Sequence, residues 1–498
     1  MVEKIALLAI FFSVTLALGI FYKKKIHSMD DFVLGGRSVG PWLTAFSYGT
    51  SYFSAVVFIG YSGQFGWNFG VAAFWIGIAN ALLGSLAAWV ILGKRTRTMT
   101  KHLSTATMPD FFAKRYNSQA LKLVSALIIF VFLVPYSASV YKGLSGIFSM
   151  AFGIDFKYCI IGMALLTGVY VVLGGYMAAA ANNFVQGIVM LGGIVAVVIA
   201  VLNGKGGFTE AISSLSQIEV AEGAVGAGKQ GAYTSLFGPE PMNLLGVMIL
   251  TSLGTWGLPQ MVHKFYTIDS EKSIKKGAII STIFALVVAG GSYFIGGFGR
   301  LYIEADKSGM PTVAYDEIMP NMLDGVLPDI LMGLVVVLVL SASMSTLSSL
   351  VISSASTLTV DCIKGFIKKD MKDNQQMFLT RTFCVLFIVV SVVLALFPGT
   401  LITNLMAISW GALSGAFLAP FMYGLYSKKI TKTAVWASFA VGIGFIVLNM
   451  FMGLMPGTNA GAVSMLITLV LVPIVSIFTK KPDKAYVDEC FACYNKVD

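Results

Sequence analysis

A cluster of hydroxyl side chains lies in the middle of an otherwise apolar stretch of this sequence. Between Ser341 and Ser349, six of nine residues are serine or threonine. Ser345 and Thr346 are adjacent, so both hydroxyls can reach one neighbouring ion. Hydroxyls and free backbone carbonyls are neutral oxygen ligands, which suit a monovalent cation better than Ca²⁺ or Mg²⁺, whose sites use carboxylates. A tight helix interface joined by Ser and Thr is the structural alternative.

A second polar stretch could complete such an ion site. Residues 47–54 read Ser-Tyr-Gly-Thr-Ser-Tyr-Phe-Ser within another apolar stretch. An unwound turn at this place would expose backbone carbonyls into a cavity that is protected from lipid. Together the two stretches predict a site for a monovalent cation between two helices.

A lysine lies inside a third apolar stretch. Lys142 comes six residues after Tyr136, and a lysine at the centre of a membrane helix costs roughly 2.5 to 3.5 kcal/mol. Such a residue normally faces a cavity or a partner, where it could pair with a substrate carboxylate or act as a titratable cation. The alternative is that Lys142 lies close enough to the outer end of its helix for the amine to reach the membrane surface.

The elements that must position these residues are membrane-spanning helices. Of 498 residues, 57% are hydrophobic and 12% are charged, whereas about a quarter are charged in soluble domains. A spanning helix needs about 20 apolar residues, and about thirteen stretches qualify. They are residues 3–22, 41–63, 71–93, 122–150, 157–176, 183–203, 241–262, 275–300, 328–360, 381–398, 401–427, 432–454 and 461–479. Little length remains for a soluble catalytic domain, and three histidines cannot supply a metal cluster, so we predict a transporter and not an enzyme.

The basic residues predict the orientation of these helices. About four fifths of the 34 lysines and arginines fall in alternate connections, and the positive-inside rule places such connections in the cytoplasm. We therefore expect a multi-pass protein of the plasma membrane with an external N-terminus and a cytoplasmic C-terminus. An odd number of crossings requires the same arrangement.

Glycine-interrupted helices suggest an internal repeat. Residues 41–63 and 241–262 are both rich in glycine, and each begins a block of five predicted helices, 41–203 and 241–427. Consecutive blocks of five helices have opposite orientations, which gives an inverted repeat with broken helices at the bilayer midplane. Glycine used for helix packing is the alternative. The remaining segments are 1–40 (first transmembrane helix and cytoplasmic loop), 204–240 (external loop with little fixed structure), 428–479 (last two transmembrane helices) and 480–498 (cytoplasmic tail).

Several motifs in this order resemble the sodium/solute symporter family, and most of all its bacterial sodium/proline permeases. They are Phe-Val-Leu-Gly-Gly-Arg-Ser-Val-Gly-Pro at 32–41, Gly-Gly-Tyr-Met-Ala at 174–178 with Gln186, Ser-Met-Ser-Thr-Leu-Ser at 343–348 and Trp-Gly-Ala-Leu-Ser-Gly-Ala-Phe-Leu-Ala-Pro at 410–420. The resemblance runs from about residue 30 to residue 430. It implies a thirteen-span LeuT-type fold that couples the entry of sodium to solute uptake by alternating access.

The resemblance also implies the positions of the binding sites. Sodium would bind the main-chain carbonyls of Thr50, Phe53 and Ala342 and the hydroxyls of Ser345 and Thr346. The residues expected to line the solute cavity are Ser54, Ala55, Tyr136, Thr251, Thr255, Trp256 and Pro259, to which the intramembrane position of Lys142 adds a possible carboxylate partner. No metal other than sodium is expected.

The chain also departs from the family pattern. Proline permeases have an aspartate where this chain has Tyr52 and a tryptophan where it has Val56, and a tryptophan and a tyrosine of their seventh span align with Thr251 and Thr255. Many members carry an aspartate at the start of the sixth span, where this chain has Asn183. The proline pocket is therefore not preserved, and both weaker sodium binding and coupling to protons stay open.

The sequence as a whole predicts a sodium-coupled symporter that imports a small organic solute, such as proline, another amino acid or a related carboxylate. A proton-coupled or sodium-independent carrier of a monocarboxylate-type metabolite is the alternative. A transporter-like sensor is another, although the tail after Lys480 is too short for a kinase domain. The expected partners are the solute, sodium and the lipid bilayer, without nucleic acid, and both a monomer and an oligomer stay open.

Overall fold

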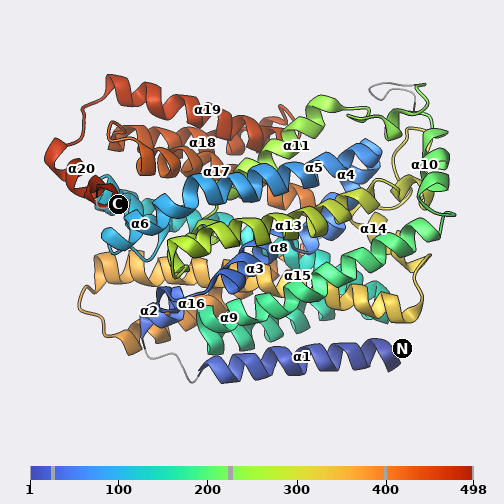
Figure 1. Cartoon of the computed structure of the whole chain (residues 1–498), viewed down its shortest axis with the longest axis horizontal. Coiled ribbons are helices and arrows are strands. Elements are labelled where there is room, and N and C mark those ends of the chain that lie inside the picture. Colours follow the sequence, from blue (N-terminus) through green and yellow to red (C-terminus); the bar gives the residue numbers. More distant parts are fainter. Residues whose placement is uncertain (1, 24–27, 222–227, 398–400, 496–498) are drawn as a thin grey trace.

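The described chain is built from helices that run side by side between two ends of a bundle (Figure 1). The computed structural model describes residues 2–23, 28–221, 228–397 and 401–495. We call the end that holds α10 and α14 the N-end, because the N-terminus lies there, and the end that holds α2, α6 and α20 the C-end (Figure 1).

The helices are α1 Val2–Lys23, α2 Met29–Leu34, α3 Pro41–Tyr52, α4 Ser62–Phe69, α5 Phe74–Ala79, α6 Lys94–His102, α7 Met108–Arg115, α8 Gln119–Phe152, α9 Phe156–Asn203, α10 Phe208–Ser216, α11 Pro241–Leu253, α12 Pro259–Thr267, α13 Glu271–Gly296, α14 Ile318–Asp324, α15 Asp329–Ser356, α16 Asp373–Leu396, α17 Ile402–Tyr426, α18 Lys432–Met452, α19 Gly457–Phe478 and α20 Lys484–Phe491. The short helical segments used below are η2 Val56–Tyr61, η4 Asn80–Ala87, η6 Ala232–Thr234, η7 Gly254–Trp256, η9 Tyr315–Glu317 and η10 Thr357–Ile367.

The apolar helices confirm the polytopic fold, but not the number of spans. Within the described residues, ten helices are long and apolar enough to cross a membrane, and α11 to η7 together with α12, bent by 41°, would form an eleventh. Within the described residues, the predicted stretches lie mainly on helices, and two of them are interrupted, at 53–54 and at 257–258. The count falls below thirteen because some stretches are divided by breaks into pieces that are too short to qualify, such as the 12-residue α3.

One break lies inside α9 and corrects a predicted boundary. Gly175 has φ 55° and ψ −159°, a backbone conformation that glycine adopts without the steric cost of a Cβ. The second arm of α9 therefore begins at this glycine and not at residue 183. Asn183 was expected at the start of the sixth span, whereas it lies about two turns into this arm.

The two long connections also contain helices. Residues 204–240 were expected to have little fixed structure, but α10 and η6 form there, because Ala211 and Leu215 of α10 pack with Tyr233 and Phe298 in a small apolar cluster. In the connection before α8, the short helix α7 begins at Met108. Thr107 caps this helix, since its hydroxyl accepts a hydrogen bond from the Asp110 amide.

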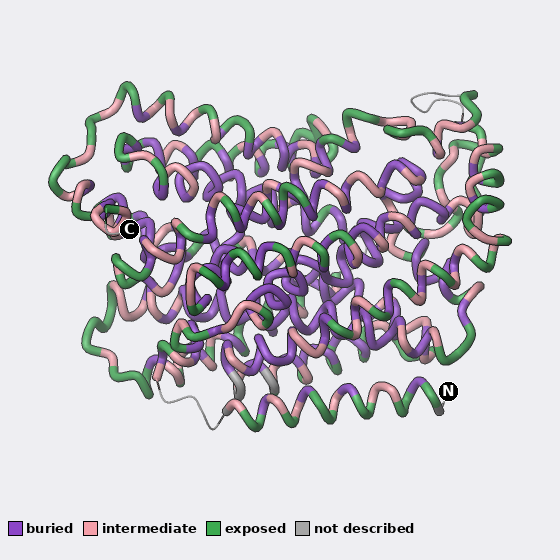
Figure 2. Tube along the Cα trace, viewed as in Figure 1, coloured by how far each residue is buried: buried purple, intermediate pink, exposed green. Residues whose placement is uncertain are grey.

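Burial separates a central group of helices from a peripheral one (Figure 2). In the most apolar 18-residue window of each helix, 83% of the residues of the α15 span and 89% of those of α17 are buried, against 17% for α1. The contacts of α3 are with α9, α12, α13 and α15. The hydroxyl-rich stretch on α15 and the glycine-containing stretch on α3 are therefore neighbours in the core.

Candidate functional site: an ion cage beside a broken helix

The site begins where α3 stops. Phe53 has an extended backbone (φ −91°, ψ 124°) and its amide donates the last bond of α3, to the Gly49 carbonyl. Helical winding resumes at Ala55, and η2, which begins at Val56, has wide π-helical turns, a form that often marks functional positions. The Ser54 hydroxyl accepts a hydrogen bond from the Val56 amide at 3.2 Å and caps this second piece.

The carbonyls released by this break turn toward α15. The Ser345 hydroxyl lies 2.9 Å from the Thr50 carbonyl and 2.8 Å from the Ala342 carbonyl. The Thr346 hydroxyl lies 3.3 Å from the Phe53 carbonyl and 3.1 Å from the Ala342 carbonyl. The structure thus brings together all five residues that were predicted to bind the ion, and we call this group the ion cage.

The chemistry of the ion cage fits a small monovalent cation. Its five residues offer three carbonyl and two hydroxyl oxygens, and none of them is a carboxylate. All five residues are buried. Each hydroxyl here donates to a carbonyl, but rotation of its O–H bond would turn a lone pair inward. Among the described residues, no group of three or more His, Cys, Asp or Glu side chains could hold a divalent metal.

A second layer of polar groups surrounds the ion cage, and the sequence did not reveal it. The Ser349 hydroxyl lies 2.8 Å from the Ser51 hydroxyl and accepts a hydrogen bond of 3.0 Å from Lys264 Nζ. Lys264 is only 2% exposed, although the charge pattern had placed it in a basic connection. The apolar neighbours Val262 and Phe265, both buried, were the signal that the helix continues past this lysine.

Asn183 belongs to the same layer. Its amide nitrogen donates to the Ser47 hydroxyl at 3.3 Å, one turn before Thr50 on α3. An amide thus stands beside α3 where the family resemblance pointed to an aspartate, so this position carries a hydrogen bond instead of a charge.

Of the residues predicted to line the solute cavity, Tyr136 lies among aromatic side chains and Ala55 lies against α8. Tyr136 packs edge-on against Trp410 with ring centroids 5.7 Å apart, and the Tyr52 ring centroid lies 5.9 Å from that of Trp410. We call these three side chains the aromatic group. The hydroxyls of Tyr52 and Tyr136 and the indole nitrogen of Trp410 are buried and lack a hydrogen-bond partner within the described chain. Trp410 begins the family motif at 410–420, but it was not predicted to line the solute cavity. Ala55 lies against α8, where a Cβ on Gly143 would come within 2.9 Å of the Ala55 Cβ.

Three residues of the broken helix α11–α12 that were predicted to line the cavity donate hydrogen bonds to η4. Thr251 donates to Asn80 Oδ1 at 2.9 Å, Thr255 to the Gly84 carbonyl at 3.1 Å and the Trp256 indole to the Leu83 carbonyl at 2.9 Å. Pro259 is the first residue of α12, where a missing amide proton costs no helical hydrogen bond. Gly254, at the break between α11 and α12, lies against the aromatic group: a Cβ added to it would be 3.4 Å from the Trp410 ring.

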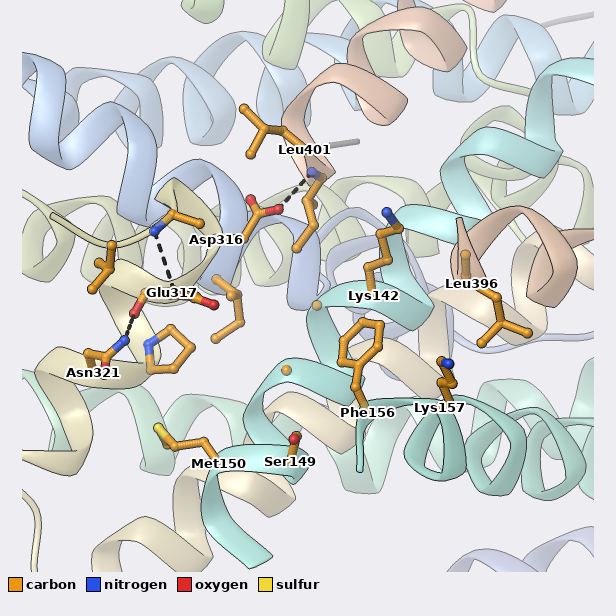
Figure 3. Close-up of a pocket in the computed structure, with 18 of the residues that line it drawn as sticks. Lys142, Ser149, Met150, Phe156, Lys157, Asp316, Glu317, Asn321, Leu396 and Leu401 are labelled. Carbon is orange, nitrogen blue, oxygen red and sulfur yellow. Dashed lines mark hydrogen bonds between the residues drawn. The ribbon is translucent and has the colours of Figure 1, made fainter. Parts of the chain in front are cut away.

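Lys142 lies apart from these residues, in a cavity of about 930 Å³ at the N-end (Figure 3). We call it the N-end cavity; its lining includes Lys142, Gly143, Asp316, Glu317, Asn321 and Ile402. Lys142 Nζ donates to the Phe397 carbonyl at 2.8 Å, and Asp316 Oδ2 accepts from the Ile402 amide at 3.0 Å. Burial raises the pKa of Asp316 to about 6, although the Ile402 hydrogen bond and the charge of Lys142 act in the opposite direction.

Comparison with known proteins identifies the family. The model of the sodium:solute symporter family matches residues 32–442. The osmoregulated proline transporter OpuE of Bacillus subtilis is 27% identical over 97% of this chain and 96% of its own length. A sodium/proline symporter of Staphylococcus aureus is 28% identical over 96% of this chain and 93% of its own length.

Solved structures show the same fold. A Na+-coupled sialic acid symporter in a substrate-bound outward-open state superposes with a TM-score of 0.78 at 17% identity, covering 97% of this chain and 98% of that one. The nucleobase-cation-symport-1 transporter Mhp1, closed around bromovinylhydantoin, gives a TM-score of 0.53 at 15% identity over 92% and 97%. The helical architecture is therefore LeuT-type, and the chain belongs to the sodium:solute symporter family as a sodium-coupled transporter and not an enzyme.

Proposed function

We propose that this symporter imports a small solute that carries a carboxylate, such as a neutral amino acid or a monocarboxylate, and that its sodium ion binds in the ion cage. The single observation that carries the proposal is the convergence of the Thr50, Phe53 and Ala342 carbonyls with the Ser345 and Thr346 hydroxyls. The prediction of these residues from sequence and their placement in space support the same ion site.

The groups beside the ion cage favour a carboxylate. The Tyr52 and Tyr136 hydroxyls and the Trp410 indole are buried hydrogen-bond donors without partners in the described residues. A sodium ion held by neutral oxygens keeps its full charge, and an anionic group close to it is strongly stabilised where water is excluded. A solute carboxylate would supply this charge and accept bonds from the three donors. Proline transport by the relatives OpuE and PutP is consistent with such a solute, although Tyr52 and Val56 change the pocket.

The direction of transport follows from the two ends. We infer that the C-end, which carries the basic connections, is cytoplasmic and that the N-end is external. One sodium ion that moves inward through 100 mV releases about 2.3 kcal/mol, and a tenfold sodium gradient adds about 1.4 kcal/mol. Together these terms support accumulation of a solute by about 500-fold.

The ion cage also suggests how the two binding events are coupled. Sodium would join the broken end of α3 to α15 and fix the backbone at 53–55, which carries Ser54 and Ala55 beside the aromatic group. The solute pocket would then be complete only with sodium present, and closure around the solute would permit the change from external to cytoplasmic access.

The test is uptake into proteoliposomes that contain the purified protein. Radiolabelled L-proline and a panel of amino acids and monocarboxylates are offered with an inward sodium gradient or with choline. We expect sodium-dependent uptake of at least one carboxylate-bearing solute, and Ser345→Ala is expected to raise the sodium concentration for half-maximal uptake at least tenfold.

Ser343→Ala is the matched control, because it removes a hydroxyl from the same helix that has no hydrogen-bond partner in the described chain. Uptake that is equal in sodium and choline for every solute of the panel would contradict the proposal. So would a Ser345→Ala variant with the sodium response of the control.

A further inference from the structure

The N-end cavity carries opposite charges on facing walls. Lys142 projects from α8 and Asp316 from η9, and the two lie on opposite sides of the cavity (Figure 3). Asp316 Oδ2 is engaged by the Ile402 amide, whereas Asp316 Oδ1 is buried and has no hydrogen-bond partner within the described residues. A buried carboxylate oxygen without a donor is costly, so the Asp316 carboxylate would be stabilised by a cationic group that approaches it from the cavity.

The cavity lies directly above the broken helix. Ile59 of η2 and Gly143 of α8 belong to its lining, and Gly143 is the residue that packs against Ala55 at the break. Gly143 therefore lies between the cavity and Ala55 at the break. A solute that enters from the N-end would pass through this space before it reaches the ion cage.

We propose that the N-end cavity is a first binding site for a zwitterionic amino acid, whose carboxylate meets Lys142 and whose ammonium meets Asp316. This inference rests on the proposed function and narrows its substrate class from carboxylate-bearing solutes to α-amino acids. A solute with a carboxylate alone would gain from Lys142 but would be repelled by Asp316, and an amine alone would meet the reverse situation.

The remaining charged residues of the N-end cavity are two acidic side chains and one basic side chain, all at its solvent-exposed edge. Its other ionisable residues are Asp155, Lys157 and Glu317, all of them exposed. They lie where solvent screens them, so the partly buried pair of Lys142 and Asp316 has the larger effect on a bound solute. Because Lys142 is an ammonium with three donors, it can keep its bond to the Phe397 carbonyl while it also donates to a solute carboxylate.

Three compounds with one ring separate the two charges. L-proline carries both, cyclopentanecarboxylate lacks the ammonium, and L-prolinamide lacks the carboxylate. Binding of each compound to the purified full-length protein is followed by saturation-transfer NMR in choline chloride, where the ion cage holds no sodium. We expect L-proline to bind at least fivefold more tightly than either analogue.

Variants of Asp316 and Lys142 test which residue recognises which charge of the solute. Asp316→Asn should weaken the binding of L-proline at least fivefold without weakening that of cyclopentanecarboxylate, and Lys142→Gln should weaken both. Lys142→Arg keeps the charge and should bind both compounds as the unchanged protein does, which shows that the loss in Lys142→Gln comes from the missing charge. Matched controls are Lys157→Gln at the cavity edge and Asp324→Asn on the exposed side of α14, and both should bind L-proline as the unchanged protein does.

The outcomes separate this inference from the proposed function. Equal sodium-free binding of the three compounds, or unchanged binding in both wall variants, would overturn the inference even where sodium-dependent uptake is normal. The absence of sodium-dependent uptake of any carboxylate-bearing solute would instead overturn the proposed function. Tight zwitterion binding that depends on Asp316 and Lys142 supports the inference.

Discussion

Two lysines lie among the membrane-spanning helices near the broken α3, and their surroundings differ. Lys142 borders the N-end cavity, where a carboxylate lies on the opposite wall. Lys264, on the C-end side of the other broken helix, is 2% exposed and contacts the Ser349 hydroxyl and the face of the Tyr176 ring, with Nζ 5.1 Å from the ring centroid. Lys142 is therefore placed where a solute could reach it, whereas Lys264 can act only on its immediate neighbours.

The neighbour that matters for Lys264 is the ion cage. Ser349, which accepts the hydrogen bond of Lys264, also donates to the Ser345 carbonyl at 3.2 Å. The ammonium is thus one side chain away from a residue of the ion cage. A buried cation without an anionic partner is costly, and sodium entering the ion cage would add a second positive charge close by.

The largest expected effect comes from removing the enclosed charge. Two unit charges about 8 Å apart repel by about 2 kcal/mol at an effective dielectric constant of about 20. Lys264→Met keeps most of the side-chain volume and removes this repulsion, so the sodium concentration for half-maximal uptake should fall about tenfold at a pH low enough to keep Lys264 protonated. Sodium titrations of solute uptake in proteoliposomes measure it.

Lys142→Met is the matched control for that substitution. It removes the same charge from the N-end cavity, so it should leave the sodium response within about twofold and raise the KM for the solute. If both variants changed the sodium response equally, the distinction between the two lysines would be lost.

A smaller effect is expected from pH on the KM for the solute, and it arises in the N-end cavity, opposite Lys142. Burial raises the pKa of Asp316 to about 6, so this carboxyl is mostly ionised at pH 7.5 and mostly protonated at pH 5. Lowering the pH should therefore remove the attraction for a solute ammonium and raise the KM for a zwitterionic solute about threefold to fivefold. Initial uptake rates at fixed sodium concentration measure the change.

The Asp316→Asn variant should show a KM that is already high at pH 7.5 and changes little down to pH 5. The other ionisable groups lining the same cavity are Lys142, Asp155, Lys157 and Glu317. A variant that kept the full pH dependence would assign the titration to one of them and contradict the role of Asp316.

The contrast between the lysines also shows which features could be predicted from sequence. Ser345 and Thr346 were predicted because a hydroxyl-rich stretch inside an apolar helix is a local pattern, and Lys142 stood out for the same reason. Lys264 did not, because it occurs where an apolar span meets a basic connection, and charge patterning alone assigns such a residue to the loop.

The rest depends on contacts between distant parts of the chain. Asp316 lies in a connection between helices, and its partial burial comes from Ile402, which follows 86 residues later. The turn at Gly175 ended one helical arm inside a continuous apolar pattern, so the position of Asn183 was wrong by about two turns. Helix type and ion chemistry were therefore accessible from the sequence, while helix breaks and cavity walls required the structure.

The smallest expected effect tests how the charge of Lys264 reaches the ion cage. Ser349→Ala removes the hydroxyl that forms hydrogen bonds with Lys264 Nζ, the Ser51 hydroxyl and the Ser345 carbonyl. Coulomb repulsion acts through space and does not need this hydroxyl, whereas a neutral hydrogen bond contributes only about 1 kcal/mol. We therefore expect the sodium concentration for half-maximal uptake to change less than about threefold, and Lys264→Met combined with Ser349→Ala to behave as Lys264→Met alone. A tenfold effect of Ser349→Ala by itself would instead show that the hydrogen bonds transmit the coupling, in which case Lys264 positions Ser345 for the ion and its charge is secondary.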